Sequence, residues 1–417
     1  MNAISIAVDL LAWAFGVHIP IVYTVLGLLW LLPTLEVIGV RTNNQHFINA
    51  AANMSNYLIL IYAIGGVFGT IITVFLAGLY PIFTNAAGLL LWPVWAIAIV
   101  SGVVIALPLI GFYNRSRGRL SMRAHIIIGY LAAIFATVIP AMFRLVFAVV
   151  NYPLGVEVIK DPNSLIGFDL VVKNYAELFA NPTYPPLLLA TIFGALALTA
   201  ILISSVYDWK WDSTKNEMYD VVSKFMKKLA LAFGAIYVIG GVWYLYEVYQ
   251  YSPTVIWSIL GHPPSYLPSA FYSVYQPTLI LSGWFYALIA LGVITLITLL
   301  ASFRVRNKIL AAINFIIPLS MVDIAEVMNL VAHLPYAIVP PVSAAEALVN
   351  NYGLTFALQV ANTLKASTFI STLDVLGTYI SQYPALLYLA DVIFVFFNIM
   401  IAVTIYFGLV WRSKQSS

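Results

Sequence analysis

Long apolar segments separated by short polar ones dominate this chain. Nine of them reach about 20 residues, the length that an α-helix needs to cross the hydrocarbon core of a bilayer. The pattern therefore predicts an all-α polytopic membrane protein in which residues 1–417 form a single transmembrane bundle. The nine expected helices are roughly 8–39, 54–80, 88–113, 124–151, 184–207, 228–251, 278–303, 309–334 and 385–411.

Composition supports a membrane protein and excludes some chemistry. Hydrophobic residues make up 62% of the chain and charged residues 8%, whereas soluble domains carry about 25% charged residues. The absence of cysteine excludes disulfides, iron–sulfur clusters and covalently attached haem. Residues 1–17 contain Asp9 and no Lys or Arg, so we expect no cleavable signal peptide. We expect a multi-pass protein of the plasma membrane, in contact with the lipid bilayer and not with nucleic acid.

The basic residues orient the bundle. Of the 19 Lys and Arg residues, three lie on one side of the predicted membrane (Lys160, Lys173 and Lys365), Arg144 lies inside a span, and the others lie on the opposite side. Because basic residues accumulate on the cytoplasmic side, the amino terminus is predicted outside and the carboxyl terminus inside. The expected inner loops are about 114–123 and 208–227. The expected external loops are about 152–183, 252–277, which lies in the interface, and 337–384, which contains a surface helix.

Four ionisable residues lie well inside predicted spans: His18, Arg144, Asp323 and Glu326. Such residues are costly in a bilayer, and they usually face a cavity, a cofactor or a partner. At 1.5 Å per residue, His18, Arg144 and Glu326 all lie about 10–15 Å below the outer boundary. Asp323 is one turn deeper than Glu326, and His333 lies near the outer end of the same span. Three helices thus bring a histidine, an arginine and a carboxylate to one depth.

Spacing alone leaves several explanations open. Arg144 and Glu326 would form a buried ion pair with His18 hydrogen-bonded nearby, or the group would bind haem through His18 and Glu326. A proton or ion pathway is less favoured, because the third, fifth and seventh spans have no charged residue in their cores. A metal site is less favoured too, because no helix carries the pattern of two histidines and a carboxylate that such a site would use. A secondary transporter predicts inverted repeats and broken helices, neither of which is evident.

The eighth span, "IPLSMVDIAEVMNLVAHLPY", together with the early histidine of the first span, resembles subunit I of the cytochrome bd oxidase family. "NYP" at 151–153 and "NP" at 181–182 are also similar to the family pattern. The resemblance implies that Glu326 ligates one haem iron of a di-haem oxygen site and His18 the other. His333 takes the position of a second acidic residue, and Leu334-Pro335-Tyr336 replaces the family's Gly-Arg-Gln-Pro-Trp.

The departures from that family are specific. Its low-spin haem b needs a histidine in the fifth helix, where this chain has about Ala190, and a methionine in the seventh, which is absent. Two glutamates of its third helix are missing, and its long quinol-binding loop is reduced to residues 252–277. The low-spin haem b site is therefore predicted to be lost.

The resemblance implies a respiratory membrane subunit that binds one or two high-spin haems, of b or d type, near the outer face. Electron transfer and reduction of oxygen would be its activity, with Arg144 offsetting propionate charge and Asp323 and His333 orienting ligands or relaying protons. A second membrane subunit and an electron-donor protein or quinol are the implied partners. The alternative is a haem-poor paralogue that pairs with a catalytic subunit; a transporter is the third.

Overall fold

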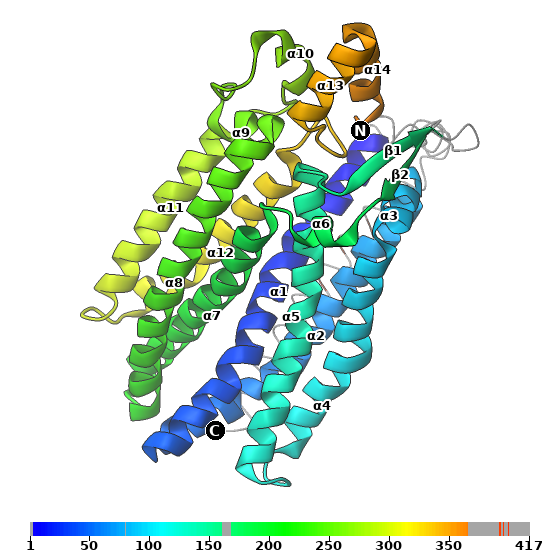
Figure 1. Cartoon of the computed structure of the whole chain (residues 1–417). Coiled ribbons are helices and arrows are strands. Elements are labelled where there is room, and N and C mark those ends of the chain that lie inside the picture. Colours follow the sequence, from blue (N-terminus) through cyan, green and yellow to red (C-terminus); the bar gives the residue numbers. More distant parts are fainter. Residues whose placement is uncertain are drawn as a thin grey trace.

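The computed structural model describes residues 3–79, 81–160 and 168–365, together with Val392, Val395 and Ile399. Eight helices in this part are long and apolar enough to cross a membrane, and the ninth predicted span, 385–411, lies almost wholly outside it. The predicted all-α membrane bundle is confirmed (Figure 1). Its helices are α1 (Ala3–Thr42), α2 (Gln45–Leu79), α3 (Pro81–Ile99) with α4 (Leu107–Ser116), α5 (Met122–Asn151), α7 (Tyr184–Thr214), α8 (Glu217–Tyr251), α11 (Ser282–Ala301) and α12 (Lys308–Val331).

The third span is continuous through a π-helical segment, Val100–Ala106, that joins α3 to α4. Three helices begin with a side-chain N-cap at the end of the bundle opposite to the N-terminus of α1. Ser121, Asn216 and Asn307 accept backbone N–H groups at the starts of α5, α8 and α12. Each cap satisfies a donor that the first helical turn leaves without a partner. Helices α5 and α12 begin within two residues of the predicted positions, whereas α8 begins at Glu217, eleven residues before the predicted 228.

One predicted inner loop is wrong. Residues 208–227 were expected to connect two spans, but α7 continues to Thr214 and α8 begins at Glu217, which leaves only 215–216 between them. The helices continue because their polar residues are paired with one another. Asp208 on α7 accepts a hydrogen bond of 2.6 Å from the Ser223 hydroxyl on α8.

Buried ion pairs join this helix pair to the connection between α11 and α12. The Lys227 Nζ lies 2.6 Å from Oδ2 of Asp208, and the Arg306 Nε lies 2.8 Å from Oδ1 of the same carboxylate. Lys227 also donates to the Ser302 carbonyl at 2.6 Å. All three charged side chains are at most 7% exposed. Three chain segments therefore depend on one buried carboxylate.

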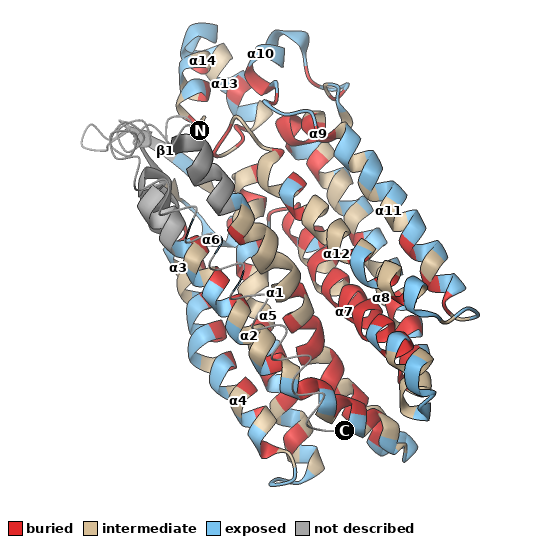
Figure 2. Cartoon of the chain, turned by 180° about the vertical axis from the view of Figure 1, so that it is seen from behind, coloured by how far each residue is buried: buried red, intermediate tan, exposed pale blue. Residues whose placement is uncertain are grey.

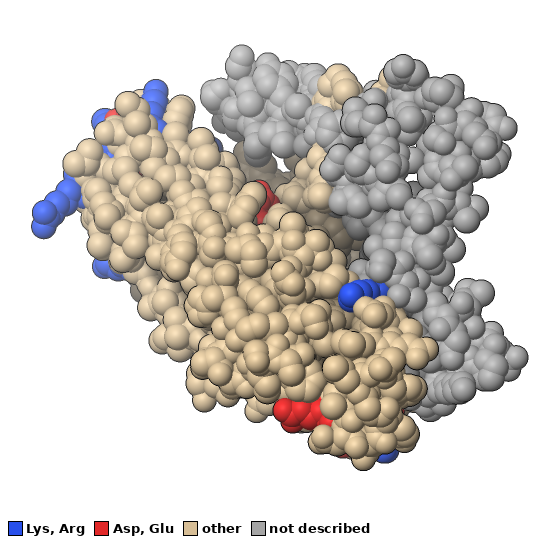
Figure 3. Space-filling view, turned by 90° about the horizontal axis from the view of Figure 1, so that it is seen from above, with Lys and Arg blue, Asp and Glu red and all other residues tan. Residues whose placement is uncertain are grey.

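The other end of the bundle carries the longer connections, and we call it the outer end, following the predicted orientation. A hairpin of β1 (Val156–Lys160) and β2 (Phe168–Val172) is followed by α6 (Tyr175–Phe179). The aromatic segment contains α9 (Pro253–Leu260) and α10 (Tyr272–Tyr275). The predicted surface helix is present as α13 (Val342–Tyr352) and α14 (Leu354–Thr363), and residues 366–384 of that loop lie outside the described part. Viewed toward this end, most of the visible described surface is free of charged side chains (Figure 3).

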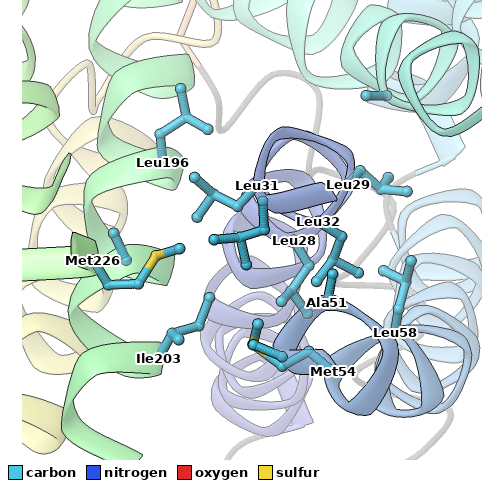
Figure 4. Close-up of a cluster of buried hydrophobic side chains, with 14 of the residues drawn as sticks. Leu28, Leu29, Leu31, Leu32, Ala51, Met54, Leu58, Leu196, Ile203 and Met226 are labelled. Atoms are coloured by element: carbon cyan, nitrogen blue, oxygen red, sulfur yellow. The ribbon is translucent and has the colours of Figure 1, made fainter. Parts of the chain in front are cut away.

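Helices α1 and α7 form the centre of the bundle and contain its most buried spans (Figure 2). Their side chains pack against each other and against α2, as Figure 4 shows for Leu31 beside Leu196 and for Leu32 beside Ala51. Burial of large apolar side chains at both faces fixes the position of α1. The functional candidates on α1 are consequently held by a rigid helix.

Candidate functional site

Arg144 of α5 and Glu326 of α12 form a two-pronged ion pair in the outer half of the bundle. The guanidinium NH1 donates to Oε2 of Glu326 at 2.8 Å, and NH2 contacts Oε1. Arg144 is 6% exposed and Glu326 8% exposed. Such a fork against a carboxylate is the strongest common geometry for a charged hydrogen-bonded pair. The ion pair considered from the sequence is thus present.

Two uncharged side chains complete the network. The Tyr23 hydroxyl of α1 donates to Oε1 of Glu326 at 2.7 Å and accepts from NH2 of Arg144 at 3.0 Å. The Thr191 hydroxyl of α7 accepts from Nε of Arg144 at 2.7 Å. Four helices therefore meet at one buried carboxylate and one buried guanidinium.

Gly194 of α7 provides room for the aromatic rings beside this network. A Cβ at Gly194 would lie 3.0 Å from the Tyr237 ring of α8 and 3.4 Å from the Tyr23 ring. Both rings pack against the bare backbone of α7 as a result. A side chain at Gly194 would press on the Tyr237 ring, which would have to shift by a few tenths of an ångström, and would touch the Tyr23 ring at ordinary contact distance.

His18 is not part of the network around Arg144 and Glu326. Its Nδ1 lies 2.9 Å from the carbonyl of Gly65 on α2, and a Cβ at Gly69 would lie 3.1 Å from its Cε1. Five residues along an α-helix amount to about 140° of rotation, so His18 and Tyr23 leave α1 in widely different directions. The hydrogen bonds of His18 lead to α2, whereas those of Glu326 lead to α1 and α5.

The remaining candidates share one face of α12 and its outer end. Asp323, Glu326, Asn329 and His333 follow each other at intervals of three, three and four residues, which places them in one stripe. Oδ1 of Asp323 is buried and has no hydrogen-bond partner among the described residues. Beyond the span, the His333 Nδ1 lies 2.5 Å from the Tyr336 carbonyl, and burial lowers the pKa of the His333 imidazole.

The stripe is connected to neighbouring helices through uncharged groups that the sequence reasoning missed. The Tyr244 hydroxyl of α8 donates to Oδ1 of Asn329 at 3.0 Å and accepts from the Asn151 amide at 2.8 Å. The Nδ2 of Asn329 is buried without a partner in the described structure. The three- and four-residue spacing on α12 was the signal that would have identified Asn329. Tyr23 and Thr191 carry no such signal in the sequence.

A second buried polar cluster lies at the inner end and was also missed. Glu36 of α1 is fully buried and pairs with Arg117 and with His125, whose Nε2 is 3.1 Å away. The other ring nitrogen of His125 lies 2.8 Å from the Ser116 hydroxyl, and the ring stacks on Tyr113. Glu36 lies near the end of α1, where a charged side chain ordinarily reaches solvent, and this position gives no sign in the sequence of its burial. Across the described residues, no three His, Asp or Glu side chains form a group suited to a metal ion.

Comparison with known proteins agrees with the arrangement of helices. The solved structure of bd oxidase from Geobacillus thermodenitrificans matches with a TM-score of 0.69 and 16% sequence identity, covering 94% of this chain and 98% of that one. This similarity shows a shared fold. No curated protein matches the chain. The family model described as "Cytochrome bd terminal oxidase subunit I" matches residues 9–412. Since that match spans nearly the whole sequence, the chain belongs to the cytochrome bd terminal oxidase subunit I family.

Proposed function

We propose that the chain is a membrane subunit of a bd-type respiratory complex and that it binds a high-spin haem through His18. Family membership supports the respiratory class. The observation that carries the proposal is the contact of the His18 Nδ1 with the Gly65 carbonyl. Such a contact fixes the tautomer and leaves Nε2 available, which is the usual arrangement of a metal-bound histidine.

The surroundings of His18 fit this role. The imidazole is half-buried, and the missing side chain at Gly69 leaves space for it against α2. The Gly65 carbonyl would hold the ring in place and increase its basicity as a ligand. A bound high-spin haem would supply one-electron redox chemistry with an open coordination position, and reduction of oxygen to water is the activity to test.

The residue types on α7 and α11 support loss of the low-spin haem b site. Ala190 stands on α7 at about the position of the family's fifth-helix histidine, and α11 (Ser282–Ala301) contains no methionine. The two ligands of that haem are therefore missing from the helices that would hold it. The proposed haem at His18 then takes electrons from another donor, which we propose to be a partner protein or a quinol, in a complex with a second membrane subunit.

The haem content of the purified protein tests the proposal. Wild-type protein is expected to give a pyridine-haemochrome spectrum, and His18→Ala is expected to abolish it because the ligand is removed. His46→Ala is the matched control, since His46 is a partly exposed histidine of α2 that lies 3.8 Å from Glu217. A colourless wild-type protein, or haem retained in full by His18→Ala, would refute the proposal.

A second candidate function is a haem-poor structural subunit that pairs with a catalytic one. The observation that favours it is the Arg144–Glu326 ion pair, which occupies a carboxylate that the family uses for iron. Wild-type protein that copurifies with a haem-containing subunit while itself lacking haem would decide for this candidate.

A further inference from the structure

We infer that the Arg144 guanidinium takes the place of a metal cation at Glu326, so that the carboxylate haem site is closed and the chain binds no more than one haem. The haem number rests on the proposed function. The identity of the partner of Glu326 does not, because it follows from contacts within the chain.

Both oxygens of Glu326 are already engaged. Oε2 accepts from NH1 of Arg144, and Oε1 accepts from the Tyr23 hydroxyl and contacts NH2 of Arg144. A carboxylate that awaited an absent ligand would leave an oxygen without a partner. Oδ1 of Asp323, one turn away on the same helix face, has no hydrogen-bond partner among the described residues. Both oxygens of Glu326 have one.

Arg144 is held so that it does not swing away from the carboxylate. Its Nε donates to Thr191 at 2.7 Å, and Thr191 in turn donates to the Leu187 carbonyl at 2.8 Å. The guanidinium carbon also lies 5.6 Å from the centre of the Phe147 ring. Each guanidinium nitrogen therefore has a partner within the bundle, contributed by three different helices.

Iron at Glu326 would oppose this arrangement electrostatically. Arginine stays protonated in proteins, so an iron cation at the carboxylate would place a second positive charge beside Arg144 in a water-poor region. Losing the carboxylate to iron would also leave the buried guanidinium without its counter-ion, which is strongly unfavourable. The ion pair and a Glu326–iron bond are for these reasons mutually exclusive.

A double-mutant cycle on the purified full-length protein tests the ion pair without reference to haem. Arg144→Leu and Glu326→Leu are each expected to lower Tm, because each leaves one buried charge alone. The double variant is expected to recover about half of that loss or more, since apolar residues often replace a complete buried pair with little penalty. Arg144→Leu combined with Glu36→Leu is the control, because Glu36 pairs with Arg117 and His125 in the separate inner cluster, and its losses are expected to add. Additive losses for Arg144 and Glu326 would overturn the inference.

Haem content gives the second readout. Glu326→Gln keeps one oxygen acceptor and removes the counter-ion of Arg144, so it is expected to lower Tm but to bind as much haem per chain as the wild type. Two haems per wild-type chain, or a loss of haem in Glu326→Gln while the protein stays folded and monodisperse, would overturn the inference. A wild type without any haem would refute the proposed function instead, and the double-mutant cycle would still decide the partner of Glu326.

Discussion

Asp208→Asn is expected to cost about 3–5 kcal/mol of folding free energy, the range seen when one partner of a buried ion pair is removed. Asp208 is the shared counter-ion of Lys227 and Arg306, whose side chains are at most 7% exposed. An amide of the same shape keeps the packing but leaves the buried Lys227 without a carboxylate partner, while Arg306 keeps only its pair with Asp220. The connections between α7, α8, α11 and α12 should loosen together.

Thermal unfolding of the purified protein, followed by the loss of monodisperse protein, measures this effect. Asp212→Asn is the matched control because it makes the same change on the same helix. Asp212 pairs with Lys215 at 3.1 Å, and that lysine is 59% exposed, so water replaces the lost partner and the cost is below about 1 kcal/mol. Equal Tm values for the two variants would show that the cluster at Asp208 is solvated.

Gly240→Ala is expected to destabilise the protein by about 1–3 kcal/mol, the usual cost of overpacking. The new Cβ would lie 2.9 Å from the backbone nitrogen of Ala190 and 3.2 Å from its Cα. Backbone atoms have no rotamer with which to move aside, so α7 and α8 must separate. The separation would also disturb Thr191, which holds Arg144 from the next position along α7.

The neighbouring Gly241 is the control for this substitution. A Cβ at Gly241 meets no atom within 4 Å, and alanine has the higher helix propensity, so Gly241→Ala is expected to be neutral or slightly stabilising. Tm values of the two variants, measured under one set of conditions, make the comparison. If Gly240→Ala were as stable as Gly241→Ala, the close approach of α7 and α8 would be disproved.

Much of this fold can be predicted from the sequence because its helices lie in a bilayer. The bilayer sets both the length of a span and the cost of burying a charge. The lengths of the apolar segments therefore predict where the helices lie, and the positions of Lys and Arg predict how the bundle is oriented. Depth follows from counting residues along a helix, and this is why Arg144 and Glu326 were expected at one level, where the ion pair holds them. The order of residues on α12 likewise carried the family resemblance, because a helix converts spacing directly into a shared face.

Counting residues does not fix which way a helix is turned about its axis. His18 and Glu326 share a predicted depth, yet His18 bonds to α2 and Glu326 bonds to Tyr23 and Arg144. The rotation of α1 is set by its packing against α2, α5 and α7, most of which lies far from it in sequence. Contacts with other helices also determine which polar residues at helix ends are buried. Glu36 and Asp208 are enclosed only because other helices bring Arg117, His125, Lys227 and Arg306 to them.

The sequence by itself therefore determined the membrane class and the presence of the eight spans found among the described residues, because each depends on one helix and the bilayer. Tertiary packing alone decided that Glu326 is bound to a guanidinium, that His18 faces α2, and that α7 and α8 touch at Ala190. These features depend on the relative rotation and approach of several helices, which no single segment encodes.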